Sequence, residues 1–161
     1  MKEKTCCFTG HREISILKLP ALKTKLKKQI EELIDHGYEI FVAGGAIGFD
    51  TLAANAVLKL REKYPHIKLH LVLPCENQDK YWTDSQKADY ARILENSDSH
   101  EYVSRSYTRY CMFQRNRKMV DLSSRVVAYY DGDGKGGTAM TVKYAEQKQI
   151  SVINLYGVSF G

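Results

Sequence analysis

The sequence predicts an α/β fold of the Rossmann-like kind, with a mostly parallel sheet and helices on both faces. Short apolar runs alternate with amphipathic helical segments along the whole chain. Glycine-rich turns stand between several of these runs and the helices that follow them. Such alternation favours parallel pairing through right-handed crossovers. No linker, internal repeat or shift in composition interrupts the 161 residues, so one domain over residues 1–161 is expected.

Each element follows from its local pattern. Strands are predicted at 4–9, 38–43, 67–73, 101–103, 125–130 and 151–155. Helices are predicted at 19–36, 49–63, 85–95, 107–122 and 138–147. Gly37 stands where a C-cap glycine belongs, and Pro65 stops the second helix. The tail, 156–161, is expected to be a terminus or a truncated continuation.

Composition and charge narrow the function classes. The chain is 43% hydrophobic and 27% charged, as ordinary globular proteins are. No apolar run is long enough to cross a bilayer, and the amino-terminal segment lacks a signal-peptide pattern, so a cytoplasmic location is expected. The net charge of +5 suits an anionic ligand, but it suits a solvated basic surface equally well.

The cysteines and histidines give no sign of a metal or redox site. Cys6, Cys7, Cys75 and Cys111 show no C-x-x-C spacing, so buried, reduced thiols are expected. His66 and His70 bracket a predicted strand, where four residues span about 13 Å, too far for one ion. We therefore expect no metal and no cofactor.

The loops that follow the strands carry the candidate site. In open parallel sheets the ligand lies outside the carboxyl ends of the strands, at the point where the strand order reverses. The candidate ligand-binding residues in these loops are Gly10, His11, Arg12, Gly44, Gly45, Gly48, Asp50, Asp131, Gly136, Gly137, Thr138 and Thr141.

The clearest chemical pattern is the turn at residues 136–138. Glycines let backbone N–H groups approach an anion, and the helix that begins there adds its positive dipole end. The hydroxyls of Thr138 and Thr141 are further donors one turn apart. The turn is neither a Walker A loop nor a G-x-G-x-x-G fingerprint, and an ordinary glycine turn capped by Thr138 explains it as well.

The other candidates also have two interpretations. Arg12 can clamp a phosphate or lie solvated in its loop. Asp50 can accept hydrogen bonds from a ribose or simply favour the dipole of its helix. Tyr81 and Trp82 suit stacking on a base or core packing. Arg115 is predicted on a helix, where an arginine is normally a surface residue.

Taken together, these residues resemble the SLOG superfamily, and within it the YpsA-like group. The segments that carry the resemblance are 7–12, 44–50, 73–76 with Gln78 and Trp82, 115–120 and 136–138. Met112, Arg115 and Met119 also fit the Met-x-x-Arg-x-x-x-Met helix of the cytokinin-activating phosphoribohydrolases. Thr141, however, stands where those enzymes carry their catalytic Glu. The resemblance thus implies Arg115 as a catalytic residue, and we take Glu76 as the carboxylate that replaces that Glu.

Three functions follow as hypotheses, and whether the chain is an enzyme stays open. The first is binding of a nucleotide or nucleotide-derived phosphate ligand, as a sensor or regulatory module. The second is hydrolysis of the N-glycosidic bond of a nucleoside 5′-monophosphate. The third is single-stranded DNA binding, because the loop at 44–50 and Arg115-Asn116-Arg117 resemble the DNA-processing DprA proteins. The resemblance also implies a homodimer, and no membrane partner is expected.

Overall fold

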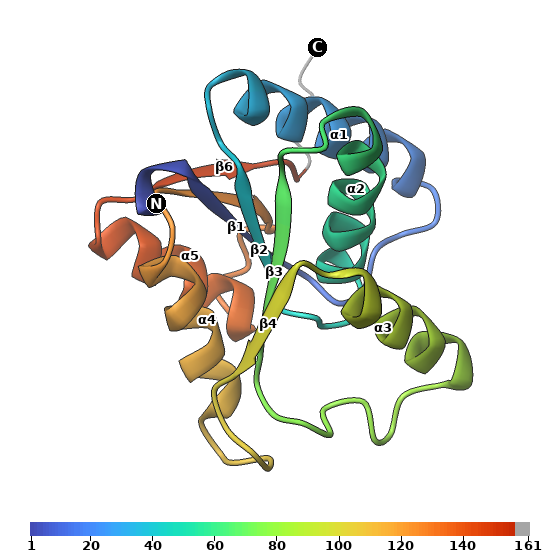
Figure 1. Ribbon diagram of the computed structural model, residues 1–161. Helices are drawn as coiled ribbons and strands as arrows, with labels where there is room; N and C mark the ends of the chain where they lie inside the picture. Colours follow the sequence, from blue (N-terminus) through green and yellow to red (C-terminus); the bar gives the residue numbers. More distant parts are fainter. Residues whose placement is uncertain (157–161) are drawn as a thin grey trace.

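The computed structural model describes residues 1–156, which form a six-stranded sheet flanked by five α-helices (Figure 1). The strands are β1 (Thr5–Gly10), β2 (Ile40–Ala43), β3 (Lys68–Leu73), β4 (Ser99–Tyr102), β5 (Arg125–Tyr129) and β6 (Ser151–Asn154). The helices are α1 (Leu19–Asp35), α2 (Phe49–Lys63), α3 (Asp84–Asn96), α4 (Cys111–Asp121) and α5 (Gly136–Gln147), and a 3-10 turn, η1 (Lys2–Lys4), precedes β1. Except for Tyr156, the predicted tail lies outside the described residues.

All six strands pair in parallel, in the order β4-β3-β2-β1-β5-β6. The chain adds β2, β3 and β4 outward from one side of β1, and then returns across the sheet to place β5 on the other side. The strand order therefore reverses between β1 and β5, which pair from Cys6↔Arg125 to Gly10↔Tyr129. The crevice outside the carboxyl ends of these two strands is the place where such sheets bind ligands.

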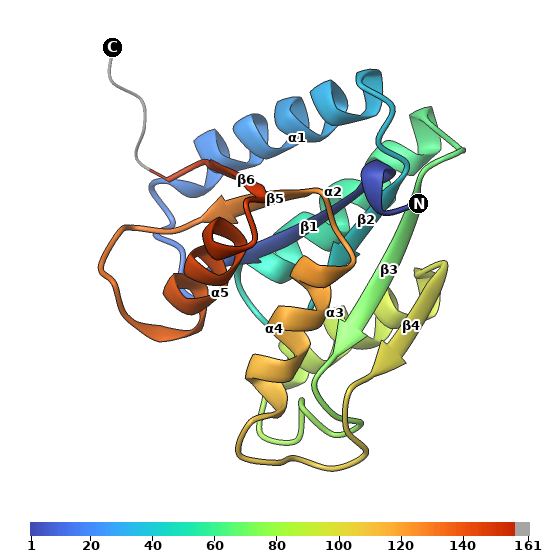
Figure 2. The same cartoon turned by 90° about the vertical axis from the view of Figure 1, so that its left-hand side faces the viewer.

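Helices cover both faces of the sheet. Figures 1 and 2 show α1, α2 and α3 on one face and α4 and α5 on the other. Because both faces are buried, neighbouring strand residues enter different cores. Phe8 and Phe41 belong to the larger core beneath α1, α2 and α3, whereas Cys7 and Val42 belong to the smaller core that includes Met119 of α4. The predicted Rossmann-like α/β class is confirmed.

Every element except α2 differs from its predicted bounds by at least one residue, and the differences at the starts of α4, α5 and β4 have physical reasons. α4 begins at Cys111 rather than at residue 107, because residues 104–110 present no buried side chain and the buried face of the helix starts with Cys111. α5 begins two residues early, at Gly136, whose φ of +81° glycine adopts without strain. β4 begins at Ser99 instead of residue 101, because it is a largely polar edge strand without an apolar signal.

The cysteines behave as expected, since all four are buried and none forms a disulfide. None of the helices in residues 1–156 is long and apolar enough to cross a membrane.

Candidate ligand-binding cleft at the strand-order reversal

A cavity of about 360 Å³ lies at the crevice between the ends of β1 and β5. We call it the glycine cavity, and its lining residues are Gly10, His11, Arg12, Ala46, Asp50, Met112, Phe113, Arg115, Asn116, Lys135, Gly136, Gly137 and Thr138. These residues come from the end of β1, the loops after β1, β2 and β5, the first turns of α2 and α5, and α4, segments far apart in the sequence. The cavity thus brings together Arg115 and most of the predicted ligand-binding residues.

The open part of this cavity is the turn that begins α5. A Cβ built on Gly136 would meet no atom within 4 Å, and one on Gly137 would meet only Asn116 Nδ2, at 3.5 Å. No side chain caps this end of α5, and its first turn contains no acidic residue. In α3, by contrast, Thr83 and Gln86 form a complete capping box. The positive end of α5 therefore faces the cavity without a side-chain acceptor among the described residues.

The glycines after β2 serve packing rather than access to the cavity. A Cβ on Gly45 would lie 2.5 Å from Leu73 Cδ2, and one on Gly48 would overlap the backbone of Arg12. A Cβ on Gly44 would lie 2.7 Å from both Arg115 Nη1 and Asp50 Oδ2. None of these three glycines lines the glycine cavity. They were predicted as ligand contacts, and the structure places them behind its wall.

Arg115 and Asp50 form the buried floor of the glycine cavity. Arg115 is 5% exposed; its Nη1 donates to the carbonyl of Gly44, and its Nε donates to Asn116 Oδ1 at 2.7 Å. The amide of Ala46 donates to Asp50 Oδ2 at 3.3 Å. Burial raises the pKa of Asp50, and the nearby positive charge of Arg115 opposes that shift. Burial also lowers the pKa of Arg115, and the negative charge of Asp50 opposes that shift. The guanidinium stays protonated, as arginine does in proteins.

Two exposed cations stand at the mouth of the cavity. Arg12, from the loop after β1, and Lys135, the N-cap residue of α5, are both exposed. Neither forms a side-chain hydrogen bond or an ion pair within residues 1–156 in this structure. With Arg115 they give the lining three fixed positive charges against the single carboxylate of Asp50. The electrostatic balance of the cavity therefore favours an anion.

A second cavity, of about 400 Å³, adjoins the first at His11 and Arg12, which line both. We call it the tyrosine cavity, and its lining residues are His11, Arg12, Glu13, Ser15, Lys18, Tyr129, Asp131 and Tyr156. Asp131 lies here rather than in the glycine cavity. Its Oδ1 accepts a hydrogen bond from the Asp133 amide at 3.0 Å, which lowers the pKa of the Asp131 carboxyl, and it lies 3.2 Å from His11 Nε2.

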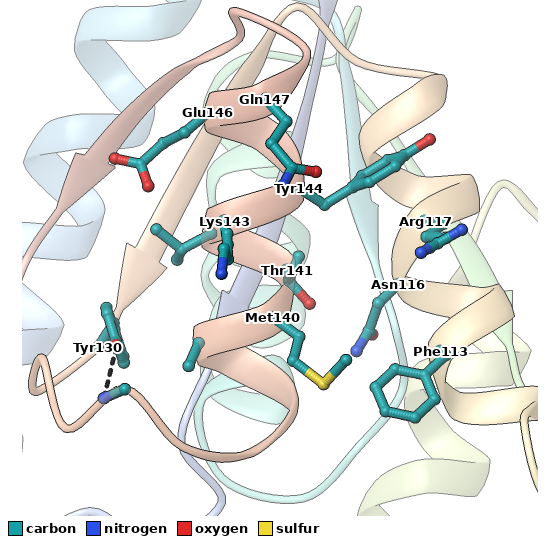
Figure 3. Close-up of a pocket in the computed structure, with 13 residues that line it drawn as sticks. Phe113, Asn116, Arg117, Tyr130, Met140, Thr141, Lys143, Tyr144, Glu146 and Gln147 are labelled. Carbon is teal, nitrogen blue, oxygen red and sulfur yellow. Dashed lines mark hydrogen bonds between the residues drawn. The ribbon is translucent and has the colours of Figure 1, made fainter.

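A third cavity, of about 640 Å³, is a groove between α4 and α5. Met140 of α5 points toward Phe113 and Asn116 of α4 across this groove (Figure 3). Thr141 lines the groove and not the glycine cavity, and its hydroxyl donates to the Gly137 carbonyl of its own helix at 2.8 Å. The structure thus places Thr141, predicted as a donor to the ligand, outside the glycine cavity, with its proton engaged in its own helix.

Glu76 is likewise placed away from the cleft. It is exposed in the loop after β3, where its amide donates to the carbonyl of Arg105 at 3.2 Å, and it lines neither cavity. The carboxylate present beside Arg115 is that of Asp50 instead. Trp82 packs edge-on against Tyr90 with 5.4 Å between ring centroids, so the core-packing interpretation holds for it. Tyr81 is 88% exposed and lines neither cavity.

Several lining residues escaped the sequence analysis. Lys135, Asn116, Lys18, Tyr129 and Tyr156 line the two cavities but were not selected as candidates. The rule that ligands lie beyond strand ends could have found several of them. Tyr129 ends β5, Lys135 lies in the loop after β5, and Tyr156 follows β6 by two residues. Lys18 also lies in the loop after β1, at the residue that precedes α1.

The fold and the cleft define a class of protein: a Rossmann-like α/β protein with an electropositive, glycine-lined cleft where the strand order reverses. Comparison with known proteins makes the assignment more specific. The family model YpsA, described as the YspA SLOG family, matches residues 6–158, and the chain belongs to this family.

The relatives share most of the chain. The uncharacterized SPbeta prophage-derived protein YoqJ of Bacillus subtilis (strain 168) is 37% identical over 140 residues, which cover 78% of this chain and 81% of YoqJ. A UPF0398 protein of Bacillus pumilus (strain SAFR-032) is 31% identical over 89% of this chain and 82% of its own. The UPF0398 protein YpsA of Bacillus subtilis is 27% identical over 91% of this chain and 86% of its own.

A solved structure shares the fold. DNA processing protein A from Helicobacter pylori, studied for its single-stranded DNA binding mode, superposes with a TM-score of 0.65 at 22% identity. The match covers 95% of this chain but 65% of that one, so the similarity spans a little under two thirds of the larger protein.

Proposed function

We propose that this chain binds a nucleotide or nucleotide-derived phosphate ligand in the glycine cavity, as a sensor or regulatory module. The observation that carries the proposal is the convergence of Arg12, Arg115 and Lys135 with the uncapped first turn of α5 on one cavity. In this role the α5 amides and Thr138 hold the phosphate, Arg12 and Lys135 clamp it, and Arg115 supplies charge from below.

Isothermal titration calorimetry against AMP, GMP, CMP and UMP tests this proposal. At least one of these nucleotides is expected to bind, and Arg12→Ala is expected to weaken that binding by about tenfold or more, because a hydrogen bond to a charged group is lost. Arg105→Ala is the matched control, since Arg105 is exposed and lines neither cavity. Absence of heat with every nucleotide, from a protein that is folded by circular dichroism, would contradict the proposal.

Cleavage of the ligand has weaker support than binding. A phosphoribohydrolase needs a free carboxylate beside the sugar, and Glu76 does not reach the cleft. Asp50 does line the cavity, but its carboxylate is buried and accepts the Ala46 amide. We therefore expect no free adenine when the protein is incubated with AMP and the mixture is separated by chromatography. Adenine above a protein-free control, absent with Asp50→Asn, would favour the enzyme instead.

Single-stranded DNA is a second candidate ligand, favoured by the fold shared with DNA processing protein A. Arg12, Arg115 and Lys135 are then the cations that meet the DNA backbone. Three neutralised phosphates give a slope of about −2 for the logarithm of affinity against the logarithm of salt concentration. Fluorescence anisotropy with labelled oligo-dT measures the slope. Weak binding that does not change with salt would exclude this candidate.

We also propose self-association through the groove between α4 and α5. Met140 is 48% exposed on this face, beside Phe113 and Tyr144, and a second copy would cover it. Analytical ultracentrifugation is expected to show a dimer that Met140→Glu dissociates, because the substitution adds a charge to the contact. A monomeric wild-type protein at tens of micromolar would contradict this.

A further inference from the structure

We propose that the tyrosine cavity is the site for the nucleoside half of the ligand, with the base on its aromatic wall and the phosphate in the adjoining glycine cavity. This inference rests on the proposed function and gives it an orientation: the phosphate lies toward α5 and the base toward Tyr156. The two cavities meet at His11 and Arg12, so one ligand can occupy both.

The charges of the two cavities differ in the way this orientation requires. The glycine cavity has three fixed cations and one carboxylate. The tyrosine cavity has two of each: Arg12 and Lys18 against Glu13 and Asp131. A phosphate dianion is stabilised by an excess of positive charge, whereas an uncharged nucleoside gains nothing from it. The balanced cavity therefore suits the nucleoside, and the positive cavity suits the phosphate.

The side chains of the tyrosine cavity match the surface of a nucleoside. Tyr129 and Tyr156 lie 4.9 Å apart between ring centroids with their planes at 54°, and His11 lies 6.4 Å from Tyr156 with its plane at 90°, so three rings line one side of the cavity at an angle to one another. Lys18 Nζ lies 4.7 Å from the centre of the Tyr156 ring and 3.3 Å from its hydroxyl, which fixes that ring at the rim. Of the two tyrosines, the half-buried Tyr156 presents the more accessible ring, and a flat base stacks on such a ring with little dependence on its identity.

Polar groups beside the wall suit the sugar. The carboxylate of Asp131 is held by the Asp133 amide and faces His11, and its remaining lone pairs can accept hydrogen bonds from ribose hydroxyls. Tyr129 is 4% exposed and its burial raises the pKa of the phenol, so it stays a protonated donor at neutral pH. Arg12, which lines both cavities, lies where phosphate and ribose join.

Calorimetry with two matched probes tests the inference. Ribose 5-phosphate contains the phosphate and sugar, and AMP adds the base. AMP is expected to bind at least tenfold more tightly than ribose 5-phosphate. Tyr156→Ala is expected to lower the affinity for AMP by about tenfold, because a stacking surface is lost. The same substitution is expected to change the affinity for ribose 5-phosphate by less than about threefold.

Controls separate this inference from the proposed function. Tyr81→Ala removes an exposed tyrosine outside both cavities and is expected to leave the affinity for AMP unchanged. Tyr156→Phe keeps the ring and is expected to restore most of the affinity that Tyr156→Ala loses, which shows that stacking rather than folding is measured. Equal affinity for both probes, or equal losses for both with Tyr156→Ala, would overturn the inference while leaving phosphate binding intact. Failure of ribose 5-phosphate and of AMP, GMP, CMP and UMP to bind the wild-type protein would overturn both proposals.

Discussion

The glycines at the glycine cavity and those behind its wall have different physical roles. Gly48 and Gly136 both have positive φ, +82° and +81°, but their surroundings differ. A Cβ on Gly48 would overlap the backbone of Arg12, whereas one on Gly136 would meet open space. Gly48 therefore lets two loops of the protein approach each other, and Gly136 leaves room at the start of α5. Only the second role leaves space for a ligand.

Alanine substitution at these two glycines should separate the roles. Gly136→Ala is expected to reduce the free energy of unfolding by about 1 kcal/mol, the cost of a left-handed conformation with a side chain. Gly48 has φ +82° and ψ −128°, a combination that residues with a side chain rarely adopt. Gly48→Ala must also displace the backbone of Arg12, so we expect about 2 kcal/mol more than for Gly136→Ala, similar to overpacking a core. Urea denaturation followed by circular dichroism measures both. Equal losses would contradict the packing role of Gly48.

The buried carboxylate of Asp50 makes a pH-dependent contribution to stability. Burial raises the pKa of Asp50 in the folded protein above its ordinary value of 3.8, which the unfolded chain keeps. At any pH between the unfolded-state pKa and the folded-state pKa, the folded state therefore binds more protons than the unfolded state. The contribution of Asp50 to the free energy of unfolding therefore decreases as pH rises through this window. The Asp50→Asn variant lacks the titration and provides the reference.

Urea denaturation of both proteins from about pH 4 to pH 7 tests the sign of this effect. The free energy of unfolding of the wild-type protein minus that of Asp50→Asn is expected to be larger at the acidic end. A difference that grows with pH would mean that Arg115 and the Ala46 amide stabilise the carboxylate more than burial penalises it.

Among the helices, α5 has a first turn whose sequence does little to stabilise it. It begins with two glycines, has no side-chain cap, and carries the cation Lys135 at its N-cap, where the helix dipole favours an anion. α3, which lines neither cavity of the cleft, has a full capping box. The contrast agrees with our proposal that the ligand supplies the missing negative charge.

Reversal of this charge should therefore move stability and binding in opposite directions. Lys135→Glu is expected to raise the free energy of unfolding by about 0.5 kcal/mol, because an acidic side chain suits the helix dipole. The same substitution is expected to lower the affinity for the nucleotide by tenfold or more. Lys28→Glu on exposed α1 surface is the matched control for net charge. A variant with lower stability but unchanged nucleotide affinity would contradict the role of this turn.

The whole molecule is layered from a rigid centre to polar edges. β1, β2 and β5 are buried almost throughout, whereas the edge strands β4 and β6 are half-buried or exposed. The cleft lies where the central strands end, so its floor belongs to the most buried part of the sheet and its mouth to loops. A rigid floor keeps the charges of Arg115 and Asp50 in place when no ligand is bound.

Hydrogen exchange measured by mass spectrometry should show this layering. The amides of β1, β2 and β5 are expected to exchange most slowly, and those of β4 and β6 at least tenfold faster, because edge strands open without disrupting the core. A bound nucleotide is expected to slow the hydrogen exchange of the amides in the first turn of α5 and in the loop after β1. Protection confined to α2 would contradict the position of the site.

The fold was predictable because its signals are local. The bounds of α2, Phe49–Lys63, are those of the prediction, since Gly48 and Pro65 flank an unbroken apolar period. β4 was harder because an edge strand needs no apolar pattern, and its partner, β3, supplies the register.

The site was predictable only in part, because the role of a residue depends on what distant segments place beside it. Gly44 needs to be glycine on account of Arg115, 71 residues away. Glu76 follows a strand, as the rule that ligands bind beyond the carboxyl ends of strands requires. That strand, β3, lies two strands from β1 in the sheet, and Glu76 is therefore too far from the cleft. Thr141 has the right spacing from Thr138, yet its hydroxyl bonds within its own helix.

The burial of all four cysteines has a practical use. A thiol introduced on the surface would be the accessible one for maleimide reagents, because Cys6, Cys7, Cys75 and Cys111 are shielded in the folded protein. Ser15 is exposed at the rim of the tyrosine cavity, and Ser15→Cys changes a single atom. A fluorophore attached there would turn the protein into an optical reporter for its own ligand, with which extracts could be screened without knowing what they contain.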